Sequence, residues 1–192
     1  NGDATLWSRN TIASNFDGAY DIAVGDIDAD GDLDVVGVAI SADEIRWWEQ
    51  DASGTSIAWI QHSIATGFTS GISVELADID GDSDLDVVAA ANATTVDSTT
   101  DDVTWWSNDQ NGASWTPTII TSALTDAYDL AVGDIDADGD QDVVAVSYRD
   151  SASKLLVLKN SDSAGGTWTN YQMASGADYL SSIALGDLDG DS

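Results

Sequence analysis

The chain has 192 residues but no cysteine, one proline, one histidine and only five lysine or arginine residues. Without cysteine it can form no disulfide, no zinc–thiolate site and no thiol nucleophile. Because nucleic acids are bound through clustered Lys and Arg, we expect no nucleic-acid partner. No apolar run approaches 18 residues, so we expect no membrane insertion. The first residues lack a basic and apolar leader, which predicts that any export signal has been removed or was not included.

Acidic residues dominate instead: 35 Asp and Glu give a formal net charge of −30. Since 43% of the residues are hydrophobic, the chain can build a core, and the charge does not indicate disorder. Eighteen of the acidic residues are aspartates in four short segments, at 26–34, 78–86, 134–142 and 187–191. We call these segments the acidic loops and number their positions from the first aspartate, so that aspartates stand at positions 1, 3, 5, 7 and 9.

Such loops are electrostatically unfavourable by themselves. Two carboxylates about 5 Å apart repel each other by roughly 3 kcal/mol at an effective dielectric constant of about 20. A solvated acidic hairpin, or surface charge adapted to a saline habitat, is one interpretation. The fixed alternation of aspartates and the apolar segments on both sides favour another, in which a bound cation neutralises each loop.

Two independent features repeat with the same irregular spacing. The first aspartates of the loops stand at 26, 78, 134 and 187, and four tryptophans stand at 7, 59, 115 and 168. Both series advance by 52, 56 and 53 residues, which indicates a true internal repeat. A period slightly above 50 residues is typical of a propeller blade rather than of a helical repeat.

Each repeat reads as four short strands. In the first, 20–26 leads into the acidic loop, 34–40 leaves it as an apolar run, and 44–49 and 58–64 alternate polar with apolar residues. The same order predicts strands at 71–78, 86–92, 102–107 and 114–121, and at 128–134, 142–148, 154–160 and 167–174. We expect no helix. Four antiparallel strands with an acidic hairpin between the first two describe a β-propeller blade.

The sequence therefore predicts an all-β chain, a single β-propeller segment over residues 1–192. It has three complete blades, at 20–65, 71–121 and 128–174, and partial strands within 4–13 and 180–192. Closed propellers have about four to eight blades, and three blades leave apolar edges exposed. We therefore expect a fragment of a larger ring or a subunit that assembles. In one variant the two terminal strands share a fourth blade.

The loop pattern suits calcium, which takes six to eight oxygen ligands in a flexible shell. Carboxylates at positions 1, 3, 5 and 9 can face one ion, with position 7 offering its backbone carbonyl. Magnesium, the rival, prefers a smaller octahedral shell, and zinc would require His or Cys. We predict three complete Ca²⁺ sites and a fourth in the truncated last loop. The candidate ligands are Asp26, Asp28, Asp30, Asp32, Asp34, Asp78, Asp80, Asp82, Asp84, Asp86, Asp134, Asp136, Asp138, Asp140, Asp142, Asp187, Asp189 and Asp191.

Position 6 of the loops differs between copies. Gly31 and Gly139 permit the left-handed conformation that a sharp turn needs. The second loop instead has Ser83 at position 6 and Gly81 at position 4. A non-glycine residue in that conformation costs roughly 1–2 kcal/mol. Either this site is weaker or its turn differs.

The segment Ala-Val-Gly-Asp-Ile-Asp-Ala-Asp-Gly-Asp-Leu-Asp-Val-Val at 23–36 is similar to the FG-GAP/VCBS repeat, found in the integrin alpha-subunit propeller and in secreted bacterial proteins. The tryptophan-rich segment at 45–49 resembles the bacterial branch. The resemblance implies calcium between the first two strands of each blade, held by positions 1, 3, 5 and 9. It also implies a secreted or cell-surface protein with a non-catalytic role in adhesion, ligand recognition or scaffolding.

Other candidate residues have less support. The repeat counterparts of His62 are Asn10, Thr118 and Tyr171, which favours a strand-surface residue over a catalytic one. The pairs Trp47-Trp48 and Trp105-Trp106 are replaced by Val157-Leu158 in the third copy. Adjacent strand residues face opposite sides, so core packing between blades is favoured over sugar stacking. A glycosylation sequon at Asn92 is uninformative alone.

We therefore expect no enzyme, because the regular carboxylates are assigned to metal and no separate acid/base pair is present. The expected function is a calcium-binding module that acts in adhesion or in structural or filament assembly. The alternative is a lectin-like, carbohydrate-binding propeller that uses its aromatic residues. The expected partners are a protein or glycan ligand, or further copies joined through the unpaired terminal strands.

Overall fold

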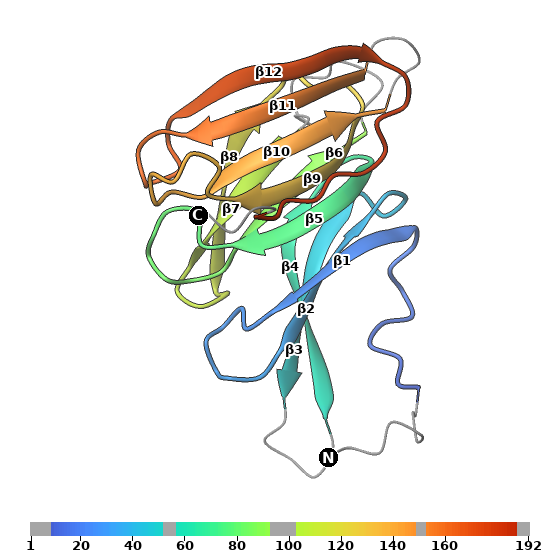
Figure 1. The fold of residues 1–192 in the computed structure, drawn as a ribbon. Helices are drawn as coiled ribbons and strands as arrows, with labels where there is room; N and C mark the ends of the chain where they lie inside the picture. Colours follow the sequence, from blue (N-terminus) through green and yellow to red (C-terminus); the bar gives the residue numbers. More distant parts are fainter. Residues whose placement is uncertain (1–8, 52–56, 93–102, 149–152, 188–192) are drawn as a thin grey trace.

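The computed structural model describes residues 9–51, 57–92, 103–148 and 153–187 (Figure 1). These residues form three four-stranded antiparallel sheets, each ordered as its strands follow in the chain. This confirms the prediction of an all-β chain built from blade-like units, although the described residues close no ring. The strands are β1 (Ala19–Gly25), β2 (Asp34–Ala39), β3 (Glu44–Asp51) and β4 (Ala58–Thr66); β5 (Gly71–Ala77), β6 (Asp86–Ala91), β7 (Val103–Asp109) and β8 (Ser114–Thr121); and β9 (Ala127–Gly133), β10 (Asp142–Ser147), β11 (Ser153–Asn160) and β12 (Trp168–Ala177).

The described ranges include no helix with the length and hydrophobicity that a membrane crossing requires.

The second strand of each blade is its most buried element. Every residue of β6 and of β10 is buried, as expected for an apolar run with both faces covered. Val87 and Ala89 point into one core cluster, shared with blade 1. Val88 and Ala90 point into the other, shared with blade 3. The alternation of side chains along β6 therefore joins the middle blade to both neighbours.

The tryptophan pairs belong to the core, as the sequence predicted. All four rings are only 2–5% exposed. Trp47 and Trp106 lie in the core cluster between blades 1 and 2, whereas Trp105 lies in the cluster between blades 2 and 3. Trp48 packs edge-on against Phe16, with ring centroids 5.0 Å apart. Each pair thus sends one ring to either side of its strand.

The first strands of the blades, β1, β5 and β9, lie side by side (Figure 1). Asp21 on β1 accepts a hydrogen bond from the N–H of Val74 on β5, at 3.0 Å. Asp129 on β9 accepts one from the hydroxyl of Ser73, at 3.2 Å, and another from the N–H of Ile183, at 2.8 Å. Carboxylates therefore connect successive blades along their first strands.

The prediction of terminal strands was wrong for the described residues. Residues 9–13 and 180–187 are not in strands; residues 4–8 and 188–192 lie outside the described ranges. Ile183 contacts Asp129 just as Val74 contacts Asp21, so the C-terminal segment occupies the place of a first strand. It forms no ladder because a first strand pairs with the second strand of its own blade, and the described residues hold none for a fourth blade.

Candidate metal centres

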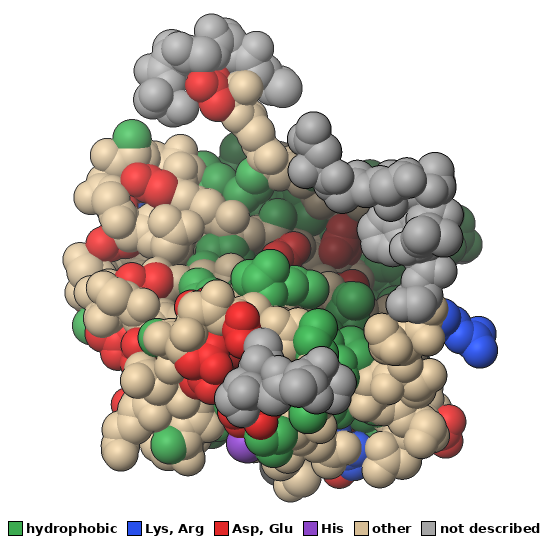
Figure 2. Space-filling model, turned by 90° about the horizontal axis from the view of Figure 1, so that it is seen from below, with side chains coloured by type: hydrophobic (Ala, Val, Ile, Leu, Met, Phe, Trp, Pro, Cys, Tyr) green, Lys and Arg blue, Asp and Glu red, His purple; other side chains and the backbone are tan. Residues whose placement is uncertain are grey.

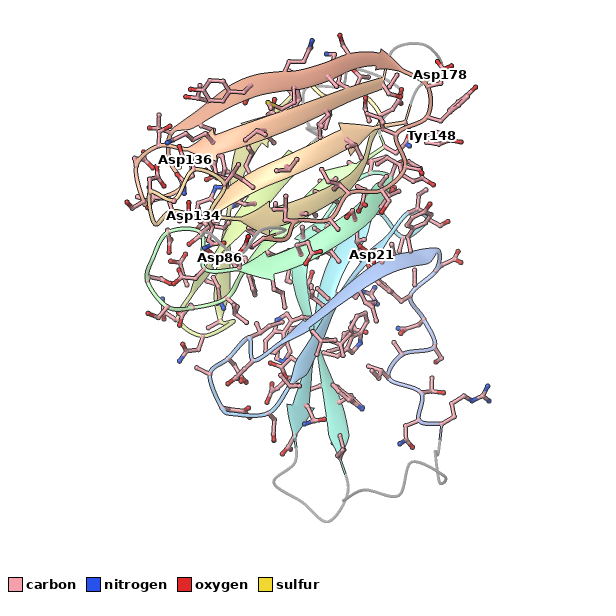
Figure 3. All side chains as sticks on the ribbon, viewed as in Figure 1. Asp21, Asp86, Asp134, Asp136, Tyr148 and Asp178 are labelled. Atoms are coloured by element: carbon pink, nitrogen blue, oxygen red, sulfur yellow. The ribbon has the colours of Figure 1, made fainter. Side chains whose placement is uncertain are left out.

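The three described acidic loops connect the first and second strands of their blades, and they share one end of the sheets. Figure 3 shows Asp86, Asp134 and Asp136 at this end, and Tyr148 and Asp178 at the opposite one. The repeat places chemically equivalent loops at equivalent corners of successive blades. Each loop can therefore be compared with the other two position by position.

Two residues of each loop are left-handed, at positions 4 and 6. Their φ angles are 60° and 97° for Ala29 and Gly31, 76° and 81° for Gly81 and Ser83, and 59° and 97° for Ala137 and Gly139. Ser83 thus adopts the conformation of its glycine counterparts, and the alternative of a different turn was wrong. Each loop contains one glycine and one strained non-glycine residue, at a cost of roughly 1–2 kcal/mol. The sequence indicated only position 6, because alanine at position 4 is not a turn signal.

The position 1 carboxylate accepts a hydrogen bond across its own loop. The donor is the backbone N–H at position 6. Asp26 accepts from Gly31 at 3.1 Å, Asp78 from Ser83 at 3.1 Å, and Asp134 from Gly139 at 2.9 Å. The contact closes the loop around the other carboxylates.

The position 9 carboxylate joins the loop to the third strand of the blade. Asp34 accepts the N–H groups of Ile27 in the loop and Gln50 on β3, at 2.9 and 2.8 Å. Asp86 bonds Ile79 and Asn108, and Asp142 bonds Ile135 and Asn160, at 2.8–3.1 Å. All three aspartates are at most 1% exposed. They are therefore structural acceptors as well as candidate ligands.

Carboxylates from positions 1, 3 and 9 converge in each loop, with one oxygen from each lying within 4.8 Å of the others. The three clusters are Asp26, Asp28 and Asp34; Asp78, Asp80 and Asp86; and Asp134, Asp136 and Asp142. The candidates at positions 5 and 7 lie outside these clusters: Asp30, Asp82 and Asp138 accept the N–H groups of Asp32, Asp84 and Asp140. In the last loop Asp187 is described, whereas Asp189 and Asp191 lie outside the described residues.

Burial makes five of the clustered carboxylates costly to ionise. Desolvation raises the pKa of Asp28, Asp34, Asp80 and Asp142 above the ordinary range. The strongest effect is at Asp86, where desolvation raises the pKa to about 7 although two backbone N–H groups oppose the shift. Neighbouring carboxylates raise these values further. Positive charge at the clusters would relieve both effects.

The first two clusters fit a hard divalent cation. Asp26 Oδ1 and Asp80 Oδ1 are buried without a hydrogen-bond partner, which is expensive for a carboxylate oxygen unless a cation or donor binds it. With the other clustered oxygens they form an all-oxygen donor set of the kind that Ca²⁺ or Mg²⁺ binds. Asp26, Asp28 and Asp34 would hold the first ion, and Asp78, Asp80 and Asp86 the second.

The third cluster already has a cationic neighbour. Lys159 Nζ on β11 forms ion pairs with Asp136 and with Asp138, the latter at 2.8 Å. Its hydrogen bond lowers the pKa of Asp138, and the two aspartates raise the pKa of Lys159. Asp134 and Asp136 are also exposed, whereas their counterparts in the other two clusters are partly buried. The three clusters are therefore alike in backbone and different in charge.

Sequence reasoning missed a contact between each of the first two loops and the next blade. The buried side chain of Asn108 donates to the carbonyl of Ile27 in the first loop, at 2.9 Å, and Asn160 donates to that of Ile79 in the second, at 3.1 Å. Both asparagines directly follow a third-strand residue whose side chain contacts their own cluster. Each asparagine follows the loop isoleucine that it contacts by 81 residues. This equal separation was the available signal for the contact.

His62 has a local structural role, in line with the prediction of a strand position. Its ring stacks on Trp47, with centroids 4.3 Å apart. Its Nε2 lies 2.8 Å from a carboxylate oxygen of Glu49. These contacts hold the imidazole between β3 and β4.

Comparison with known protein families matches residues 26–89 and 134–192 to the FG-GAP-like repeat. The two matches together cover more than half of the chain and include all three clusters, so the chain belongs to the FG-GAP-like repeat family. This confirms the resemblance found in the sequence. No curated protein matches the chain.

The raised pKa of Asp86 predicts a pH dependence of the metal-free protein. Because the folded-state pKa of about 7 exceeds the ordinary value of 3.8, the folded protein binds the proton more tightly than the unfolded chain. The free energy of unfolding should therefore fall as pH rises from about 4 to about 7, by up to roughly 4 kcal/mol from this group. Urea unfolding in excess chelator at pH 5 and pH 8 measures the difference, which Asp86→Asn should reduce.

Asp84→Asn is the matched control, because it removes an aspartate two residues away that is outside the cluster. It should retain most of the wild-type pH dependence. Equal pH dependence in the two variants would contradict the assignment to Asp86.

Proposed function

We propose that this chain is a calcium-binding, non-catalytic propeller segment of a secreted or cell-surface protein, and that it acts in adhesion or structural assembly. The observation that supports calcium most directly is the recurrence of one carboxylate cluster at the same corner of three successive blades. Calcium bound there would supply the positive charge and the flexible oxygen coordination that the clusters call for. The position 9 aspartates would transmit this stabilisation to the third strands.

The absence of catalysis is part of the proposal. The clustered aspartates are engaged with loop and strand N–H groups, and His62 is held by Trp47 and Glu49. Neither set is arranged as a pair of carboxyl groups flanking an open substrate cleft. The acidic surface between apolar patches, seen in Figure 2, suits an extracellular protein that stays soluble through its charge.

Calcium should raise the melting temperature. At free calcium 100-fold above Kd, each occupied site adds roughly 2.7 kcal/mol to the free energy of unfolding. Thermal melting in excess chelator and in millimolar calcium measures the shift, and magnesium at the same concentration should give a smaller one. An unchanged melting temperature would count against calcium binding.

The triple variant Asp28→Asn, Asp80→Asn, Asp136→Asn removes one carboxylate from every cluster and should lose most of the shift. Asp17→Asn removes an exposed aspartate outside the loops and should retain it. A shift that survives in the triple variant would place the calcium elsewhere on the chain.

The assembly role is supported by an apolar face on blade 1. Ile22 on β1 is 61% exposed, whereas its equivalents Val74 and Leu130 are 1% and 2% exposed between blades. Tyr20 and Val24, on the same face of β1, are also exposed. Figure 2 shows hydrophobic side chains open to solvent on the side that includes the first sheet. This face matches the packing surface of a further blade, which another copy of the chain can provide.

Self-association through this face should depend on Ile22. We expect light scattering after size exclusion to give a mass above the 20.0 kDa of one chain, and Ile22→Asp to lower it towards the monomer. Ile119→Asp is the control, because this exposed isoleucine lies on the outer strand of the middle blade. A monomeric wild-type protein at high concentration would refute the assembly role.

A second candidate function, carbohydrate binding, is favoured by a group of tyrosines at the end opposite the acidic loops (Figure 3). Tyr148 stacks on Tyr128 and contacts Tyr179, with centroids 4.8 and 4.9 Å apart, and the hydroxyls of Tyr128 and Tyr20 are 3.1 Å apart. Exposed rings with hydroxyl groups suit the apolar faces and hydroxyls of sugars. The buried tryptophans offer no such surface.

Binding to a glycan array would test this candidate. Tyr148→Ala should weaken any sugar binding at least about tenfold, or about 1.4 kcal/mol. Tyr171→Ala removes an exposed tyrosine of β12 outside the group and should leave binding intact. A wild-type protein that binds no glycan would eliminate it.

A further inference from the structure

One position of the third strand faces the acidic cluster in every blade. Gln50, Asn108 and Asn160 are equivalent, since the N–H of each bonds the position 9 aspartate of its loop. The residues before them are therefore equivalent too. They are Glu49, Ser107 and Lys159: an acid, a neutral hydroxyl and a base at one structural position.

The contacts of these residues confirm that the position looks onto the cluster. Ser107 Oγ donates to Asp80 at 3.3 Å. Lys159 Nζ donates to Asp136, the aspartate equivalent to Asp80, and to Asp138. In blade 1 the charge of Glu49 acts on Asp28, the third member of the series. Ser107 and Lys159 thus contact the position 3 carboxylate directly, whereas Glu49 acts on its counterpart only through its charge.

The consequence for a cation differs between loops. In the first two clusters, Asp26 Oδ1 and Asp80 Oδ1 are buried and lack hydrogen-bond partners, so no donor or cationic side chain among the described residues neutralises these oxygens. In the third, the ammonium of Lys159 binds a cluster carboxylate directly. A calcium ion entering there must displace this ammonium or bind beside a like charge, and either costs affinity.

Resting on the proposed calcium binding, we propose that Lys159 is a built-in counter-ion of the third loop, which makes this loop the weakest calcium site of the three. Glu49, which also contacts His62, adds negative charge near the first site, and Ser107 adds none at the second. The third blade therefore holds its loop without calcium, while the first two blades require the ion. Falling calcium would loosen blades 1 and 2 and leave blade 3 in place.

Per-site titration of the full chain can test this. The N–H groups of Gly31, Ser83 and Gly139 each bond the position 1 aspartate of one loop, so their NMR resonances report the three sites separately. With calcium alone as the probe, we expect Gly139 to titrate at a concentration at least about tenfold higher than Gly31 or Ser83, or about 1.4 kcal/mol.

A reciprocal exchange isolates the side chain responsible. Lys159→Ser gives the third loop the residue of the second, and should lower the midpoint at Gly139 at least about tenfold without moving that at Gly31. Ser107→Lys should raise the midpoint at Ser83 by a similar factor. Lys154→Ser is the matched control: it removes the same charge from β11 about 16 Å along the strand, where Nζ bonds the carbonyl of Ala123, and should move no midpoint.

The outcomes separate this inference from the proposed function. If all three amides titrate together and Lys159→Ser changes nothing at Gly139, the inference is overturned and calcium binding stands. If Lys154→Ser has the same effect as Lys159→Ser, net charge rather than the contact is responsible, and the inference is overturned as well. If no amide responds to millimolar calcium, the proposed calcium binding fails and the inference with it.

Discussion

The buried aspartate at position 9 of each acidic loop is the constraint on which the blades depend. Asp34, Asp86 and Asp142 accept one N–H from the loop and one from the third strand. A buried charge is tolerated only when it is well bonded or paired with a cation. Two hydrogen bonds leave the pKa of Asp86 near 7, so they compensate only part of the desolvation. Loop, strand and cation site consequently form one energetic unit.

That unit recurs with the same backbone and different side chains. Positions 4 and 6 are left-handed in all three loops, whether the glycine is at position 4 or at position 6. Asn108 and Asn160 both donate to a loop carbonyl of the preceding blade, so the first two acidic loops also contribute to blade packing. The side chain beside the cluster, in contrast, changes its charge from blade to blade. Repetition therefore preserves the fold while the electrostatics of each copy vary.

Features that depend on neighbouring or periodic residues could be predicted from the sequence, whereas features that depend on distant residues could not. Strands and repeats were readable because alternation with period two and the 52–56-residue steps are local or periodic signals. The buried Trp47 and Trp105 were anticipated because their third counterpart, Val157, is aliphatic. The terminal strands were misjudged because a ladder depends on a neighbouring strand. Lys159 was overlooked because it follows its loop by a whole strand and turn.

The sequence by itself determined that this chain repeats a four-stranded unit, that aspartates gather between the first and second strands, and which residues stand there. All three follow from side-chain periodicity and from the chemistry of single residues. Only the tertiary structure decided that positions 1, 3 and 9 converge while the position 5 carboxylates accept the N–H groups at position 7. It also decided that Glu49, Ser107 and Lys159 share one place. These contacts join residues that are distant along the chain. They therefore depend on strand register and on how each loop folds back.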